Sequence, residues 1–280
     1  MIEIISSGIY TTLQDQGRFG YRNYGVPISG PMDLISAQNA NLILNNEPNA
    51  ALLEFTLQGA IFRFNKPAII AITGATTSPT LNDEKIKINT PINIQANDCL
   101  KIGRCAKGIY GYLAILGGFL GEKKLNSLSQ YKGITSKTRI LKGETLLFNP
   151  NVDQVESRHN KIALIDFNAT EIPALKGPDY NNIHPEKAKR LLLNSFTVST
   201  EINRMGYRVD AKTPIEMAEV LTSPVQPGTI QLTPSGKLIV LMSDCQTTGG
   251  YARIFQLSAK SRSILAQKRT GENFRIKLMD

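Results

Sequence analysis

Short runs in which apolar and polar residues alternate recur along this 280-residue chain. The clearest are the pairs Ile86 and Ile88, Ile92 and Ile94, and Leu100 and Ile102, and the run Phe274, Ile276 and Leu278. Successive side chains of a strand point to opposite faces, so this alternation indicates strands with one buried face. Turn-forming residues such as Asn82-Asp83 and Asn97-Asp98 separate the runs at the short spacing typical of antiparallel sheets and barrels. We therefore predict a mainly β fold.

Two or three short helices are predicted within this β pattern. The first spans about residues 31–45, where Ser29 is the expected N-cap and Pro31 suits the first turn. The second begins at Pro185 and carries apolar residues at helical spacing on one face. The third would lie around residues 261–267.

A polar stretch over residues 149–160 lacks apolar periodicity and is the best candidate for a domain junction. It would separate an N-terminal module, residues 1–150, from a C-terminal module, residues 160–280. Residues 18–22 and 204–208 share four of five amino acids, RFGYR against RMGYR. Such a short match fits two related modules or two unrelated turns.

Charge and hydropathy limit the classes of partner. The formal net charge of +9, with seven basic residues between Arg253 and Lys277, favours anionic ligands or acidic partners. That stretch lacks the series of aromatic residues that would stack on bases, so we expect a solvated basic face and no nucleic acid. The apolar runs are too short to cross a membrane. The first five residues do not resemble a secretory signal, and we expect a cytoplasmic protein.

Metal chemistry and a Ser-His-Asp triad are not expected. The three cysteines have no spacing typical of a metal or redox site. There are only two histidines, and His159 lies in the polar stretch. Acid–base chemistry would therefore use Asp, Glu, Lys or Tyr.

A glycine-rich segment from Gln14 to Pro31 places Asp15 and Arg18 in an extended loop before a predicted helix. Glycines allow the backbone to approach a ligand, and the arginine fork suits a carboxylate or phosphate. This favours an anion-binding loop. A structural Asp15-Arg18 pair in a tight turn is the alternative.

Residues 203–208 place Asn203 before two arginines, Arg204 and Arg208, on either side of a glycine. The arrangement suits a clamp for an anion. Alternatively, Arg208 pairs with a carboxylate such as Asp210 on a surface strand.

A third segment, residues 228–251, combines an apolar strand with a dense set of polar groups and glycines. The strand ends in Asp244, which is followed by Gln246, two threonines and Tyr251. Asp244 could act as a base or orienter, Gln246 could hold an amide, and Tyr251 could donate to a developing oxyanion. A hydroxyl-rich hairpin turn is the alternative. The chain has no GxxxxGK(S/T) or complete GxGxxG motif for a nucleotide.

These segments together resemble the C subunit of 5-oxoprolinase. That family is also known as allophanate hydrolase subunit 2 and as the carboxyltransferase portion of urea carboxylase. The resemblance rests on four sequences in the family's order: QDQGRFGYRNYGVPISGPMD, YLAILGGF, NRMGYR and SPVQPGTIQLTPSGKLIVLMSDCQTTGGY.

The resemblance implies two tandem cyclophilin-like β-barrel modules. It also implies a complex with the B and A subunits of 5-oxoprolinase that opens 5-oxoproline to L-glutamate with ATP and is inactive without its partners. ATP would bind at a partner subunit or an interface. The family's catalytic residues correspond to Arg204, Asp244 and Tyr251. Its substrate-binding residues correspond to Asp15, Arg18, Asn203, Arg208, Gln231, Gln246, Thr247 and Thr248. Loops from both modules would then form a pocket for a small anionic amide or lactam.

The chain departs from the family pattern in three places. Residues 126–130 read Asn-Ser-Leu-Ser-Gln, where the family has a Gly-Ser-Arg-Ser-Thr-like segment. Ala252 replaces a proline, and Ala259-Lys260 stands where an acidic residue is common. These departures leave a changed activity open.

Two other functions therefore stay open. One is carboxyl transfer to urea or a related amide with a separate biotin carrier. The other is a non-catalytic regulator that binds a kinase inhibitor resembling the B subunit of 5-oxoprolinase.

Overall fold

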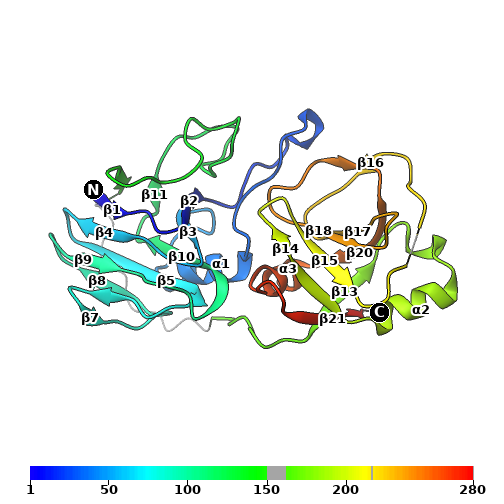
Figure 1. The fold of residues 1–280 in the computed structure, drawn as a ribbon. Coiled ribbons are helices and arrows are strands. Elements are labelled where there is room, and N and C mark those ends of the chain that lie inside the picture. Colours follow the sequence, from blue (N-terminus) through cyan, green and yellow to red (C-terminus); the bar gives the residue numbers. More distant parts are fainter. Residues whose placement is uncertain (150–161, 216, 280) are drawn as a thin grey trace. The chain divides into compact units, whose positions relative to one another are not determined.

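The chain forms two compact units in a computed structural model that describes residues 1–149, 162–215 and 217–279 (Figure 1). The first unit comprises residues 1–18 and 29–165, and the second comprises residues 19–28 and 166–280. Most of the predicted junction over residues 149–160 lies outside the described residues, as does His159.

The strands of the first unit lie in two antiparallel sheets. One sheet has the order β11 (Phe119–Leu120), β12 (Thr145–Phe148), β1 (Ile2–Ser6), β4 (Ile61–Phe64), β9 (Cys99–Lys101), β6 (Thr80–Leu81) and β7 (Glu84–Lys85). The other has the order β2 (Tyr10–Gln14), β3 (Leu52–Thr56), β10 (Lys107–Ile115), β5 (Ala68–Thr76) and β8 (Ile92–Ile94). One buried apolar cluster, which includes Ile2 and Phe62 from the first sheet and Leu53 and Ile72 from the second, forms the core of this unit.

Helix α1 (Leu34–Ile43) packs against β5 and β10 in the first unit (Figure 1). Its N-cap is Asp33, whose carboxylate accepts a hydrogen bond from the Ser36 amide at 3.0 Å. The prediction that Ser29 caps this helix is wrong, because Ser29 has a positive φ of 63° and lies in the turn before it. Asp33 is the stronger cap because an anionic acceptor also complements the helix dipole.

The second unit is built on a closed barrel (Figure 1). Its strands follow the order β13 (Glu171–Lys176), β20 (Ala252–Leu257), β17 (Thr229–Leu232), β18 (Leu238–Leu241), β15 (Gly206–Ala211), β14 (Phe196–Ile202) and β21 (Asn273–Leu278). Pairing of β13 with β21 is parallel, and it closes the ring so that no edge is left unpaired. Alternate residues fill the interior, where the Phe196 and Phe274 rings lie 5.8 Å apart.

Smaller elements complete the second unit. Strands β16 (Ser223–Pro224) and β19 (Thr248–Gly249) form a short two-stranded sheet, and η1 (Arg22–Tyr24) and η2 (Tyr180–Asn182) are single 3-10 turns. Helix α2 (Pro185–Leu193) begins at the predicted proline, and α3 (Ala259–Ala266) lies close to the predicted third helix. Among the described residues, every helix is too short or too polar to cross a membrane.

The predicted mainly β fold is confirmed, and most of the alternating runs lie in strands. The run at Ile86 and Ile88 is an exception, because it follows β7 and is not part of a strand. Both side chains are half-buried against the core of the first unit. Here the alternation of apolar and polar residues therefore reflects burial on one side, and it does not mark a paired strand.

Candidate functional site

Asp15 follows the end of β2 and is buried, with 4% of its surface exposed. Its Oδ1 accepts hydrogen bonds from the Gly17 amide at 2.9 Å, Ser127 Oγ at 2.6 Å and Ser129 Oγ at 2.7 Å. Its Oδ2 accepts from the Leu128 amide at 2.7 Å. The carboxylate therefore holds residues 127–129 in place, and this positioning role occupies both oxygens.

Arg18 binds the same segment and is fully buried. Its Nη2 donates to the Ser129 carbonyl oxygen. Asp15 and Arg18 thus contact one segment through its amide, its hydroxyl groups and a carbonyl. That segment lies within residues 126–130, where the chain departs from the family pattern, and its two serines supply the hydroxyl donors to Asp15.

A buried polar cluster in the first unit was missed from the sequence. Glu54, 2% exposed on β3, accepts hydrogen bonds from the Met32 amide at 2.7 Å and the Tyr112 hydroxyl at 2.9 Å. The Asp33 amide donates to the same hydroxyl at 2.7 Å. Burial, with the Glu54 and Asp33 carboxylates nearby, raises the pKa of Tyr112 well above its ordinary value, so its proton stays available to Glu54. A lone acid inside the apolar strand Leu52–Thr56 was the available sequence clue.

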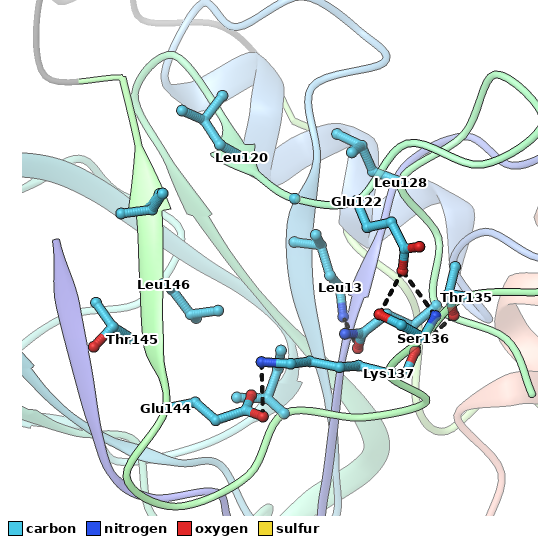
Figure 2. A pocket seen from close by; sticks show the side chains of 14 residues that line it. Leu13, Leu120, Glu122, Leu128, Thr135, Ser136, Lys137, Glu144, Thr145 and Leu146 are labelled. Carbon is cyan, nitrogen blue, oxygen red and sulfur yellow. Dashed lines mark hydrogen bonds and ion pairs between the residues drawn. The ribbon is translucent and has the colours of Figure 1, made fainter.

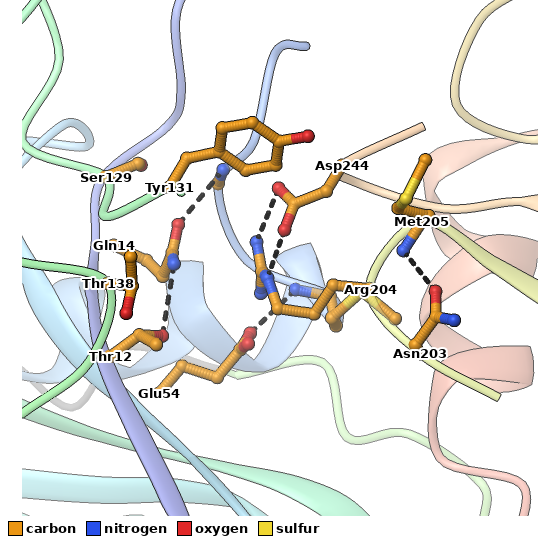
Figure 3. A network of polar contacts seen from close by, with 12 residues as sticks. Thr12, Gln14, Glu54, Ser129, Tyr131, Thr138, Asn203, Arg204, Met205 and Asp244 are labelled. Carbon is orange, nitrogen blue, oxygen red and sulfur yellow. Dashed lines mark hydrogen bonds and ion pairs between the residues drawn. The ribbon is translucent and has the colours of Figure 1, made fainter. Parts of the chain in front are cut away.

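Gln14 is a second buried residue that the sequence did not single out. Its side-chain carbonyl accepts from the Gly30 amide at 3.1 Å, and its amide donates to Thr12 Oγ1 at 3.1 Å (Figure 3). Gly30 has a φ of +83°, and a Cβ there would lie 2.9 Å from the Gln16 carbonyl oxygen, so only glycine fits this turn. Gln14 and Glu54 therefore fix the loop that enters α1.

Arg204 and Asp244 form a two-point ion pair in the second unit (Figure 3). Arg204 Nε donates to Asp244 Oδ2 at 2.7 Å and Nη2 donates to Oδ1 at 3.1 Å. Only 10% and 7% of the two side chains are exposed, and the Asp244 amide also donates to the Arg204 carbonyl at 2.8 Å. Of the two roles considered for Asp244, this geometry favours the orienter, because both carboxylate oxygens bind the guanidinium.

Asn203 shapes the turn that carries Arg204. Its side-chain oxygen accepts from the Met205 amide at 2.8 Å (Figure 3). It also accepts from the Gly206 amide at 3.1 Å. Arg208, on β15, is half-exposed and pairs with Glu201 at 2.5 Å. The surface ion pair that we considered for Arg208 therefore exists, but Glu201 is the partner, while Asp210 lies 3.5 Å from Lys237.

The remaining predicted residues lie on or after β17 and β18. Gln231 is buried on β17 and donates to the Tyr251 carbonyl at 3.3 Å, so it binds this residue's backbone. Thr247 accepts the Val225 amide through its carbonyl at 3.0 Å, and Thr248 lies in β19. The Gln246 side chain is exposed. Contact of these residues with a common ligand stays a prediction.

Cys245 directly follows Asp244, and Arg22 lies beside its thiol. Cys245 is 1% exposed, and its burial raises the pKa of the thiol to about 11, although Arg22 partly offsets this effect. The thiol is therefore protonated at neutral pH and is a poor nucleophile. Arg22 Nη2 donates to the Val225 carbonyl, which ties residues 19–28 to the second unit.

None of the three cysteines forms a disulfide. Within the described ranges, no group of three His, Cys, Asp or Glu side chains is arranged to hold a metal ion. The polar groups that the structure does gather are carboxylates, guanidiniums, amides and hydroxyls. These groups suit an organic anion or amide.

Comparison with known families decides which group of proteins this chain falls in. The family described as carboxyltransferase domain, subdomain A and B, matches residues 24–278. The chain belongs to this carboxyltransferase-domain family. The match covers both compact units, so membership does not rest on one motif.

Two curated relatives are similar over nearly their whole length. The C subunit of 5-oxoprolinase from Haemophilus influenzae is 31% identical over 286 residues, covering 98% of this chain and 90% of the relative. The C subunit of 5-oxoprolinase from Escherichia coli is 33% identical over 279 residues, covering 97% and 89%. The resemblance identified from the sequence is confirmed, and the relatives' names support a role for this carboxyltransferase-domain chain as a subunit of an enzyme complex.

A solved structure shares the fold. The urea carboxylase of Kluyveromyces lactis superposes with a TM-score of 0.86 at 26% sequence identity, covering 100% of this chain. The carboxyltransferase-domain chain corresponds to 27% of that longer protein.

Proposed function

We propose that this chain is the C subunit of an ATP-dependent 5-oxoprolinase, which opens 5-oxoproline to L-glutamate together with the A and B subunits. The observation that carries the proposal is the similarity to two C subunits over about nine tenths of their length. The buried, oriented guanidinium of Arg204 supports it, because the substrate is a lactam that also carries a carboxylate.

The residues of this chain have distinct parts in the proposed reaction. Asp244 orients Arg204, whose charge attracts the substrate carboxylate or the phosphoryl group on the activated lactam oxygen. Asn203 holds the turn that presents this arginine. Tyr251 supplies a hydroxyl proton to the ring nitrogen as its bond to the lactam carbon breaks, and Gln246 binds the amide. Asp15 and Arg18 position residues 127–129.

When bound, ATP would supply the phosphoryl group that activates the lactam oxygen, with ADP as the leaving group. Water would then add to the lactam carbon, and phosphate release and cleavage of the ring C–N bond would give glutamate. The chain lacks a P-loop motif. We therefore assign ATP to a partner subunit or its interface with this chain. A small anionic lactam is the substrate class that this division of roles fits.

Carboxyl transfer is the second candidate, favoured by the family's description and by the structural similarity to a urea carboxylase. It would need a separate biotin carrier and would move a carboxyl group from carboxybiotin to the nitrogen of an amide. Substrate choice separates the two functions.

The test uses this chain co-expressed with its neighbouring subunits and, in a second preparation, with a biotinylated carrier, a biotin carboxylase and bicarbonate. Glutamate and ADP formation are measured with 5-oxoproline, and ADP formation and carboxylation are measured with urea. The proposal expects equal amounts of glutamate and ADP from 5-oxoproline. Carboxylation of urea without 5-oxoproline turnover would establish the second candidate instead.

A further inference from the structure

A pocket of about 240 Å³ opens in the first unit, and none of the eleven predicted site residues lines it (Figure 2). Its apolar walls include Leu13, Leu128, Ile140 and Leu146, and its polar rim includes Glu122 and Lys137. Drug-sized ligands occupy pockets of roughly 300–1,000 Å³. The available space therefore suits a smaller molecule.

The pocket exists because the ladder between β11 and β12 opens at one end. The last pair in that ladder is Leu120 with Leu147. Gly121 then lies against β2, where a Cβ would be 2.6 Å from Leu13 Cδ2, and Glu122 turns toward Ser136. The chain after β11 thus leaves β12 uncovered on this side.

The main chain of Thr145 faces this opening. The Ile4 amide donates to the Glu144 carbonyl, and Ile2 is paired with Leu146, so Glu144 and Leu146 direct their main-chain groups toward β1. Because these directions alternate along a strand, the N–H and C=O of Thr145 point to the β11 side, where β11 has ended. They supply one donor and one acceptor beside the apolar wall.

Charged groups of both signs line the rim (Figure 2). Glu122 Oε2 accepts from the Ser136 amide at 2.8 Å and the Ser136 hydroxyl at 2.7 Å, and these bonds lower the pKa of Glu122. Lys137 Nζ lies 2.9 Å from Glu144 Oε1. Lys124 Nζ lies 3.4 Å from the other Glu122 oxygen, Oε1. The rim therefore carries two carboxylates, each beside one ammonium, above an apolar floor.

We propose that this pocket binds a small zwitterion, an α-amino acid with an aliphatic side chain. The side chain would occupy the floor formed by Leu13, Leu128 and Ile140. The ligand carboxylate would meet Lys137 and the Thr145 N–H, and its ammonium would meet Glu122. Each charge of the ligand thus meets an opposite charge at the rim.

Other ligand classes fit less well. A purely apolar molecule would cover Glu122 and Lys137 without replacing their water, which is costly. A phosphate or dicarboxylate would face two carboxylates. An aliphatic amine would leave the Thr145 N–H without an acceptor.

A ligand in this pocket would also contact residues 127–129, the segment that Asp15 binds. The Leu128 amide donates to Asp15, while its side chain lines the pocket. The pocket is therefore placed to regulate the position of residues 127–129 through that leucine. Binding itself can be tested without any assay of turnover.

The test is isothermal titration calorimetry of the full chain with L-leucine, with 3-methylbutylamine and 4-methylpentanoate as analogues that lack one charge. Leucine should bind, and each analogue should bind about tenfold more weakly or worse, because a charge-assisted contact is lost. Glu122→Gln should weaken leucine binding to a similar extent, and Lys137→Met should do the same. Glu84→Gln, a change at an exposed acid on β7 of the same unit, should leave it unaltered.

Absence of saturable heat with leucine would overturn the proposal. Equal affinity for leucine and 4-methylpentanoate would overturn it too, because the ammonium would then have no partner. Unchanged binding by Glu122→Gln and Lys137→Met, with circular dichroism spectra like that of the unaltered protein, would place the ligand elsewhere.

Discussion

At the scale of single residues, the structure shows what the carboxylates of Asp15 and Asp244 bind within the protein: each holds other groups of the chain in position. The sequence identified Asp15 in a glycine-rich loop before a helix and Asp244 at the end of an apolar strand. It could not show that both oxygens of each carboxylate are already bound, since Ser127 and Arg204 come from distant parts of the chain. It missed Glu54 because a single acid in an apolar strand has no spacing pattern.

Asp244→Asn should destabilise the second unit and reduce turnover. The change leaves the buried Arg204 guanidinium without its charge partner, and breaking a buried pair costs about 3–5 kcal/mol. Chemical denaturation should therefore show a lower free energy of unfolding. Glu201→Gln, which breaks the exposed pair with Arg208, is the matched control and should cost about 1 kcal/mol or less. Equal losses in the two variants would contradict the account.

Asp15→Asn should loosen residues 127–129. An amide has one acceptor oxygen in place of two, so at least one donor among Ser127 Oγ, Ser129 Oγ and the Leu128 amide loses its bond. Hydrogen exchange followed by mass spectrometry should show faster exchange of the Leu128 amide. Asp83→Asn, at a side chain that is 80% exposed, is the control, and it should leave that rate unchanged.

At the scale of elements, strand prediction succeeded wherever alternation coincided with pairing. β8, β9 and β21 lie on the predicted runs, whereas Ile86 and Ile88 alternate without a partner strand. The start of α2 was found because proline fixes the first turn of a helix. The start of α1 was misplaced, because Ser29 and Asp33 both belong to the residue types that cap helices, and the positive φ of Ser29 is visible only in the structure.

The stability that the Asp179–Arg253 ion pair gives to the contact between η2 and β20 should depend on pH. Hydrogen bonds from Arg253 lower the pKa of Asp179, with a distance of 2.9 Å to Arg253 Nε. A carboxyl whose pKa is lower in the folded protein stabilises it above the unfolded pKa, and this stability is lost as pH falls through the folded value. Unfolding followed from pH 7 down to acid should show this loss. Asp179→Asn should flatten it, and an unchanged acid limb in that variant would exclude the link.

The pairing of β3 with β10 leaves no room for a larger residue at Gly111. A Cβ there would lie 2.1 Å from Phe55 Cζ, so Gly111→Ala should cost about 1–3 kcal/mol by overpacking. The double variant with Phe55→Leu should recover part of that loss. If the second change only adds to the first, steric conflict with Phe55 is not the cause.

At the scale of the whole molecule, the family resemblance supplied what periodicity could not. Alternation indicated β structure, but the closed barrel depends on the parallel pairing of β13 and β21, which lie about a hundred residues apart in sequence. The assignment of residues 19–28 to the second unit likewise depends on contacts such as Arg22 with Val225. Residues 18–22 and 204–208 are similar in sequence but differ in burial, since Tyr207 is buried and Tyr21 is half-buried.

The most direct test of the central claim is glutamate formation from 5-oxoproline by the complex reconstituted from this chain and the A and B subunits. The account predicts ATP-dependent turnover that disappears when this chain is omitted. It also predicts that turnover falls roughly 100-fold or more with Arg204→Ala, in a complex that still co-purifies. Turnover that persists at the same rate without this chain, or with Arg204→Ala, would contradict it.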